Sequence, residues 1–387
     1  MKIGIISCDG WLRQWDNYGT LFQNYALQKH LQKQGHETFW ILTRPEKRSL
    51  KEVFGRVFFH PKAVLSFARS VFVSRVIRRK ERVLFKKFNA AHPRFFNDFF
   101  NKYIPHTEQR YSDADLIQSP PPADCYIVGS DQVWSGVTVK AFLGFGGKHA
   151  RRVAYAVSTS WKNKDEGWQR KAREMLPAFN AVSVREPEGL GVCMNGGRAD
   201  AVHVCDPTLF LGRDEYLSIV NQEGCNVSFP RKTVLAYFLN IKKLSQLPWQ
   251  GVVEFAKERS ADLKVVPLQG AELVIPEEYV YTPSPTEWLN AYDKADCILT
   301  NSFHGTAFAI IMRKPFLVVL QKGKTEGENC RFFSILKKLG LESRIFDSSK
   351  GKIAAQMDEA IDWDCVAEKL NAFRSFSRQF LERALSC

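Results

Sequence analysis

Residues 301–308, NSFHGTAF, decide the fold because they join a strand-like run to a helix-like run. The apolar run 295–300 precedes this stretch, and the apolar run 307–312 follows it. Residues 316–320, FLVVL, then form the next strand-like run. The spacing of the apolar residues changes along these runs, which predicts a compact β-loop-α-β unit with a polar loop between its first strand and its helix.

His304 stands in that polar loop. Loops at the carboxyl ends of strands face the ligand crevice of an open α/β sheet, and free N–H groups at a helix start attract anions. Histidine titrates near neutrality, so His304 is a candidate proton carrier or anion ligand. In the simpler interpretation, Ser302 caps the helix and His304 bonds a neighbouring carbonyl. The residues alone leave both interpretations open.

The rest of the chain repeats this alternation of strands and helices. Residues 2–7 and 38–42 are strand-like, with a helix predicted over 20–34 that ends at Gly35. A G-x-G-x-x-G turn is missing after the first strand, which argues against dinucleotide binding. The further predicted strands are 125–128, 152–158, 181–184, 201–204, 233–239, 264–267, 297–300 and 316–320.

The 387 residues suit two domains of average size. We expect an N-terminal α/β domain over 1–211 with a basic helical insertion at about 51–110, and a C-terminal α/β domain over 212–349. The linker is predicted at Gly212 to Asp214. A helical tail is expected over 350–387, packed across either domain.

The positive charge is concentrated in one segment. Residues 44–94 hold fifteen Lys and Arg against three Glu, which is most of the net charge of +14. One interpretation is a helical insertion that packs its apolar stripe on the sheet and leaves its charges in water. The other is a basic amphipathic surface that lies on anionic lipid. Nucleic-acid binding is disfavoured because no nucleic-acid motif is present.

The cysteines and the hydropathy indicate the compartment. The nine cysteines are scattered without a CxxC pair, which argues against a disulfide framework or a zinc site. No run reaches the roughly 18 apolar residues of a membrane span, and MKIGIIS lacks the apolar core of a signal peptide. We expect a cytoplasmic protein, peripheral to the inner face of the membrane if the basic segment binds lipid. We expect no metal and no cofactor.

Five motifs together resemble the polysaccharide pyruvyl transferase family. They are NYG at 17–19, GSDQVW at 129–134, SVRE at 183–186, DPTLFL at 206–211 and NSFHGTAF at 301–308. The resemblance implies two doubly wound Rossmann-like domains that face a cleft, as in the GT-B architecture. It also implies phosphoenolpyruvate as donor and a pyruvate ketal on one sugar as product. The acceptor belongs to a surface polysaccharide, or to its polyprenyl-diphosphate-linked precursor.

This chemistry needs cations for the donor, a proton for its methylene carbon, and acceptors for the protons of two sugar hydroxyls. The resemblance assigns donor binding and catalysis to Arg185 and His304. Arg185 follows the predicted strand 181–184, so we expect it at the edge of the cleft, where it grips a carboxylate or phosphate with two N–H groups. The alternative is a weak ion pair with Glu186.

The sequence departs from the family pattern at Ser302, where some relatives carry an arginine. We therefore expect the missing positive charge from Lys322, Lys324 or Arg331, with help from polar groups at the helix start. The predicted donor-binding residues are Arg185, Asn301, Ser302, His304, Gly305, Lys322 and Arg331.

Asp131 is the candidate general base or sugar ligand, with a helix cap as the alternative. We expect Asp206 to fix the turn between the domains rather than to take part in the chemistry. The predicted acceptor-binding residues are Asn17, Tyr18, Gly19, Gln132 and Trp134.

Two other functions remain open on the sequence. The first is a GT-B glycosyltransferase that uses a nucleotide sugar, although no acidic ribose ligand is evident. The second is a non-catalytic, membrane-peripheral assembly protein that relies on the basic segment.

Overall fold

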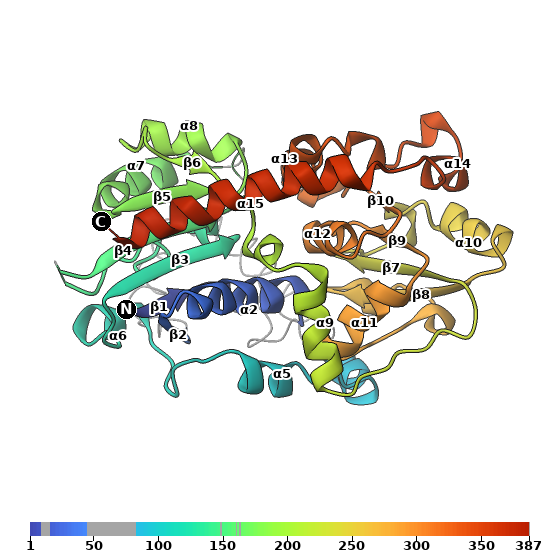
Figure 1. Cartoon of the computed structure of the whole chain (residues 1–387), viewed down its shortest axis with the longest axis horizontal. Coiled ribbons are helices and arrows are strands. Elements are labelled where there is room, and N and C mark those ends of the chain that lie inside the picture. Colours follow the sequence, from blue (N-terminus) through green and yellow to red (C-terminus); the bar gives the residue numbers. More distant parts are fainter. Residues whose placement is uncertain (9–15, 45–82, 148, 160, 162–163, 387) are drawn as a thin grey trace, which may run out of the picture.

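A computed structural model describes residues 1–8, 16–44, 83–147, 149–159, 161 and 164–386. The described chain forms two sheets whose strands are all parallel. The first sheet has the order β2-β1-β3-β4-β5-β6, and the second has the order β10-β9-β7-β8. The two sheets lie side by side along the length of the molecule (Figure 1). The prediction of two parallel α/β units is confirmed.

The first sheet is built from the N-terminal part of the chain. Most residues of its inner strands are buried, which is usual for parallel sheets covered by helices. The strands are β1 (Lys2–Ile6), β2 (Glu37–Trp40), β3 (Cys125–Asp131), β4 (Arg151–Val157), β5 (Ala181–Val184) and β6 (Val202–His203). The helices are α2 (Tyr18–Lys33), α5 (Phe96–Tyr103), α6 (Asp113–Gln118), α7 (Glu166–Met175) and α8 (Glu188–Asn195), with a 3-10 turn η4 (Pro207–Phe210).

The second sheet follows helix α9 (Arg213–Gln222), which begins inside the predicted linker. The helix starts there because the Gly212 amide donates to the Glu215 carboxylate at 2.7 Å. The strands are β7 (Thr233–Leu239), β8 (Asp262–Leu268), β9 (Cys297–Thr300) and β10 (Phe316–Val318). The helices are α10 (Trp249–Glu258), α11 (Pro285–Lys294), α12 (Phe303–Ile311) and α13 (Cys330–Leu339).

One hydrophobic core continues from the first sheet to the second. Helix α2 supplies Tyr18 and Phe22, whose rings stack on Trp288 of α11 at centroid distances of 5.0 and 5.6 Å. Phe308 of α12 packs against the same tryptophan at 4.8 Å. Because aromatic side chains bury large apolar areas, this contact holds the two halves of the molecule together.

The C-terminal tail is helical, and it contacts both halves. Helix α14 covers Ile353–Met357, and the long helix α15 covers Trp363–Ser386. In Figure 1, α15 runs from the side of β10 across to β4. Near its end, the Arg151 guanidinium donates to the Ala384 carbonyl at 2.9 Å, and near its start Arg313 donates to the Trp363 carbonyl at 3.1 Å.

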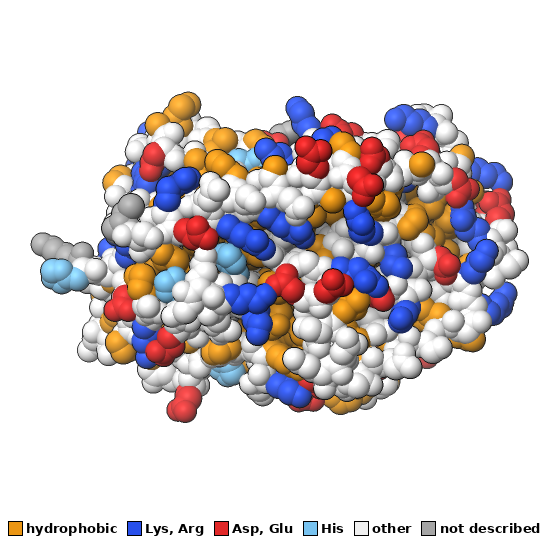
Figure 2. Space-filling view, viewed as in Figure 1, with side chains coloured by type: hydrophobic (Ala, Val, Ile, Leu, Met, Phe, Trp, Pro, Cys, Tyr) orange, Lys and Arg blue, Asp and Glu red, His pale blue; other side chains and the backbone are white. Residues whose placement is uncertain are grey.

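Most of the predicted basic segment, residues 45–82, lies outside the described residues. Its described end is helical over 83–91. Arg94 is buried rather than solvated, and donates to the Pro267 carbonyl of β8 at 2.8 Å. Figure 2 shows Lys and Arg side chains interspersed with Asp and Glu over the visible face. Within the described ranges, no helix has both the length and the hydropathy to cross a bilayer.

Candidate functional site

Arg185 directly follows β5 and lies at the centre of a buried ionic cluster. Its side chain is only 2% exposed. The guanidinium donates to Glu186 at 2.9 Å, to Asp206 at 2.9 Å and to Asp131 at 3.2 Å. It also donates to the Ser158 hydroxyl at 3.0 Å. Arg185 therefore already neutralises protein carboxylates, and the weak exposed pair considered above is a buried one.

Asp131 ends β3 with φ near +65°, a backbone conformation that residues other than glycine rarely adopt. One carboxylate oxygen accepts from Arg185, and the other accepts from the Thr20 hydroxyl at 3.2 Å. The Asp131 side chain remains 12% exposed, more than the other two carboxylates that bond Arg185. Strained residues often occur at functional sites, which fits its proposed role.

Asp206 precedes the turn η4 and joins that turn to the cluster. One carboxylate oxygen accepts from the Thr208 amide at 3.0 Å and from its hydroxyl at 2.8 Å. The other oxygen accepts from Ser130 Oγ at 3.0 Å and from Arg185. Asp206 thus fixes the turn, as expected, and also faces the candidate site.

The charges of the cluster stabilise one another. Burial by itself raises the pKa of Asp206, but His304 and Arg185 outweigh burial and hold that pKa well below its usual range. Burial by itself also raises the pKa of Asp131, but Arg185 and His304 outweigh burial and lower that pKa below its usual value. Burial lowers the pKa of Arg185, whereas Glu186 and Asp131 raise it above its usual value. At neutral pH both aspartates are ionised.

His304 enters this site from the second half of the molecule. It lies in the first turn of α12, not in a loop before the helix, because Ser302 caps α12 at the Gly305 amide at 3.3 Å. His304 Nε2 is 3.7 Å from the Asp206 carboxylate. This buried nitrogen has no hydrogen-bond partner among the described residues.

Gly19 allows His304 to occupy this position. A Cβ atom on Gly19 would lie 2.1 Å from His304 Nδ1, far inside contact distance. Gly19, which the sequence predicted as an acceptor-binding residue, therefore contacts the histidine. The spacing of the NYG motif gives no indication of this contact.

Three other residues of the NSFHG stretch have structural roles. The Asn301 side chain bonds both backbone groups of Leu239, at 2.8 and 2.9 Å, and so ties β9 to the end of β7. Ser302 is the helix cap that the simpler interpretation foresaw. Gly305 packs its Cα near Thr300, where an added Cβ would be 2.2 Å from the Thr300 hydroxyl oxygen.

The predicted replacement cations are placed unequally. Lys322 is exposed, whereas Arg331 is 9% exposed and pairs with Glu328 at 2.6 Å. Arg331 lies at the start of α13 and contributes to the lowered pKa of Asp131. Of the two, Arg331 has the electrostatic contact with the cluster.

The predicted acceptor residues separate into two groups. Asn17 and Gln132 are half-buried, and the Asn17 side chain caps α2. Tyr18 is fully buried, and its hydroxyl donates to the Pro283 carbonyl. Trp134 is also fully buried, and its Nε1 donates to the Ala141 carbonyl at 2.9 Å. Neither ring offers a face to a sugar, because both pack inside the protein.

Two neighbours of the cluster were missed by the sequence reasoning. Thr20 directly follows the NYG motif and bonds Asp131, and Ser130 bonds Asp206. The motifs GSDQVW and DPTLFL contain Ser130 and Asp206, but a motif does not specify which of its side chains meet. In the described ranges, no group of three or more His, Cys, Asp or Glu is arranged to hold a metal ion.

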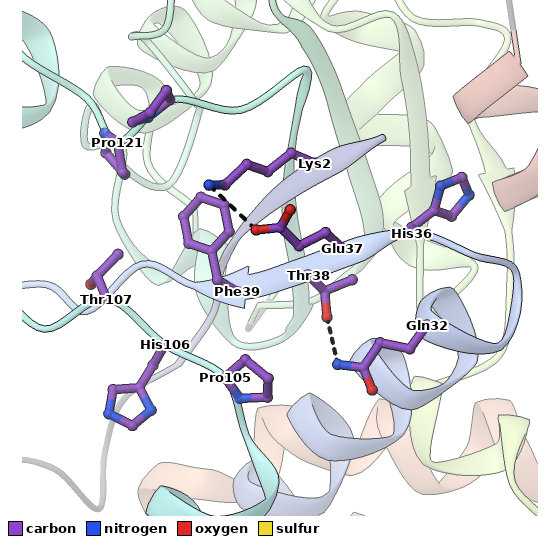
Figure 3. Close-up of a pocket in the computed structure, with 11 residues that line it drawn as sticks. Lys2, Gln32, His36, Glu37, Thr38, Phe39, Pro105, His106, Thr107 and Pro121 are labelled. Carbon is purple, nitrogen blue, oxygen red and sulfur yellow. Dashed lines mark hydrogen bonds and ion pairs between the residues drawn. The ribbon is translucent and has the colours of Figure 1, made fainter.

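A separate groove of about 480 Å³ lies at the opposite edge of the first sheet. Lys2 and Glu37, at the amino ends of β1 and β2, point toward one another in it beside Phe39 (Figure 3). The ionic cluster instead follows the carboxyl ends of β3 and β5. This groove is therefore no part of the candidate site.

The chain is similar to several solved structures. The UDP-GlcNAc 2-epimerase of Methanocaldococcus jannaschii, in complex with UDP-GlcNAc and UDP, matches with a TM-score of 0.52 and 10% identity, over 99% of this chain and 100% of that chain. The Neisseria meningitidis epimerase matches with a TM-score of 0.42 and 11% identity, over 100% and 94% of the chains. The Anabaena protein HepE, in complex with UDP and glucose, matches with a TM-score of 0.48 and 10% identity, over 98% of this chain and 95% of that chain. At such identities the likeness shows the GT-B fold alone.

A search among curated proteins found no match. The family model for polysaccharide pyruvyl transferases matches residues 17–322, which include all five motifs and every member of the ionic cluster. The chain belongs to the polysaccharide pyruvyl transferase family.

Proposed function

We propose that this protein transfers the pyruvyl group of phosphoenolpyruvate to two hydroxyls of one sugar in a surface polysaccharide or its lipid-linked precursor. The observation that carries the proposal is the position of His304. The histidine of the family motif is buried in the ionic cluster, with its Nε2 3.7 Å from the Asp206 carboxylate.

The reaction needs protons to move in both directions. One hydroxyl proton of the sugar balances the proton added to the donor methylene, which becomes a methyl group. The second hydroxyl proton leaves with the phosphate as the carbon–oxygen bond to phosphate breaks and the second sugar oxygen attacks. His304 is the proposed proton carrier for the methylene carbon, since imidazole is the side chain that most often transfers protons in enzymes.

The donor carries a carboxylate and a phosphate, so it requires positive charge. Arg185 is paired with three carboxylates, and its contribution to donor binding is correspondingly reduced. We assign the remaining charge to Arg331, whose charge acts on Asp131, and to Lys322, which is exposed. Ser302 and Gly305 complete the donor side at the start of α12.

Asp131 is proposed to bind an acceptor hydroxyl. Its lowered pKa keeps the carboxylate ionised, so it accepts a hydrogen bond from a sugar hydroxyl readily and a full proton reluctantly. Its partly exposed side chain and the neighbouring half-buried Gln132 are the described groups of that motif open to a ligand.

Phosphate release from phosphoenolpyruvate tests the proposal. The purified full-length protein is incubated with the donor and with lipid-linked or free galactose- or mannose-type acceptors, and phosphate is measured with and without acceptor. We expect acceptor-dependent release, which His304→Gln lowers by about 10²–10⁴-fold, the usual contribution of a proton-transfer group. No release with any acceptor, together with no thermal stabilisation by phosphoenolpyruvate, would refute the proposal.

A nucleotide sugar is the second candidate donor, because the M. jannaschii epimerase of the same fold binds UDP-GlcNAc and UDP. Thermal stabilisation by UDP-sugars and not by phosphoenolpyruvate would favour this glycosyltransferase-like function. A membrane-peripheral assembly role is tested by sedimentation with anionic vesicles. Binding that persists in His304→Gln, with no turnover of either donor, would favour that role.

A further inference from the structure

We propose that Asp206 is the positioning residue of His304, and that it selects the ring nitrogen that exchanges the proton. The inference rests on the proposed function, which makes His304 the proton carrier. It also assigns to Asp206 a role beyond the turn that its sequence context predicts.

The Asp206 carboxylate is held in one orientation. Its side chain is fully buried, and four hydrogen bonds reach it from Thr208, Ser130 and Arg185. A carboxylate with these partners cannot rotate without losing several of them at once. Its oxygen on the side of Arg185 is therefore fixed toward His304 Nε2.

This arrangement gives the two ring nitrogens different roles. An ionised carboxylate accepts a hydrogen bond from an N–H group. The neutral imidazole beside Asp206 therefore carries its hydrogen on Nε2. Nδ1 is then the nitrogen left to exchange a proton with the substrate. Gly19 packs against the Nδ1 side of the ring, and any side chain at this position would clash with His304.

The pair also joins the two halves of the molecule. Asp206 follows β6 of the first sheet, whereas His304 follows β9 of the second. Their separation of 3.7 Å exceeds the ~3.2 Å limit of an N–H···O hydrogen bond. Hydrogen bonds of this kind are often long in unliganded enzymes and tighten when substrate binds. A small movement of the His304 ring toward Asp206 would complete the bond.

The charged groups around the pair come from both halves. The Arg185 guanidinium donates to Asp206 through one nitrogen, and its other two nitrogens donate to Asp131 and Glu186. Arg331 acts on Asp131 from α13. Any change in the pH profile must be compared with a variant that disturbs this cluster but leaves Asp206 in place.

The test compares Asp206→Asn with wild type in the full-length protein. We expect kcat to fall by about 10²–10⁴-fold, with KM for phosphoenolpyruvate within a few-fold, because the variant removes the charge that orients His304 and no donor contact. The pH–rate profile of the variant should also change. Glu186→Gln is the matched control, since it removes a different carboxylate of Arg185. Glu186→Gln should lower the stability of the protein about as much as Asp206→Asn does, but it should keep the pH–rate profile of wild type.

A second measurement does not depend on turnover or on the folding of the Asp206 variant. Nitrogen-15 NMR of the wild-type histidines, assigned with His304→Gln, reports which nitrogen of the neutral ring carries hydrogen. We expect Nε2–H for His304. Finding Nδ1–H, or an Asp206→Asn enzyme with kcat within about threefold of wild type, overturns the inference. If wild type neither binds nor turns over phosphoenolpyruvate, the proposed function fails instead, and the NMR result still decides the pairing.

Discussion

Arg185 shows how one residue can satisfy two interpretations of a motif. The SVRE motif suggests a ligand-binding arginine, and the structure places this arginine among three carboxylates inside the protein. An uncompensated buried carboxylate is costly, so the guanidinium has a structural role whatever else it does. Loss of activity in an Arg185 variant is therefore not by itself evidence of a catalytic role.

Arg185→Ala should lower the free energy of unfolding by roughly 3–5 kcal/mol, because it leaves buried carboxylates unpaired. Urea denaturation followed by circular dichroism measures this change. Lys322→Ala is the control at an exposed position and should stay within about 0.5 kcal/mol of wild type. An Arg185→Ala protein with the wild-type urea midpoint would contradict the structural role.

At the scale of elements, the start of α12 is the position where the sequence reasoning was least accurate. The strand before it was predicted correctly as 297–300, but the helix begins at Phe303 rather than at Ala307. The Ser302 cap explains the earlier start, since its hydroxyl satisfies the Gly305 amide. His304 is thereby held by a helix rather than by a loop.

Replacing Ser302 separates its capping role from any donor contact. Ser302→Ala should cost about 0.5–2 kcal/mol of stability, whereas Ser302→Gly should cost only a few tenths, because glycine is tolerated at N-caps. Thermal melts of both variants are compared with their KM for phosphoenolpyruvate. If both raise KM equally while differing in stability, the hydroxyl also binds the donor. If KM follows stability, Ser302 acts only as a cap.

At the scale of the whole molecule, the buried His30 and the half-buried His203 make stability depend on pH. Burial lowers the pKa of both His30 and His203 to about 4. His30 of α2 packs against Phe210 of η4, and His203 packs against Phe373 of α15. Both therefore lie where helices join the first sheet to the rest of the protein.

The sign follows from proton binding. Between about pH 6.5 and pH 4 the unfolded chain protonates these histidines and the folded chain does not, so stability falls as the pH is lowered through that window. The loss is at most about 3 kcal/mol for each histidine. Urea midpoints are measured from pH 7 to pH 4. Their decrease with falling pH should be smaller in the double variant His30→Gln/His203→Gln than in wild type. It should be unchanged in His149→Gln, which replaces an exposed histidine. Equal slopes in all three proteins would refute this assignment.

The sequence by itself determined the parallel α/β class, the positions of most strands and the family, because hydrophobic periodicity and ordered motifs are local properties of the chain. It also brought His304, Arg185 and Asp131 forward as candidates. Only the tertiary structure decided that Asp206 faces His304, that Arg185 is buried, and that Trp134 is part of the core. These facts depend on which strand ends meet across two sheets and on which charges are excluded from water, and neither property is contained in a local stretch of sequence.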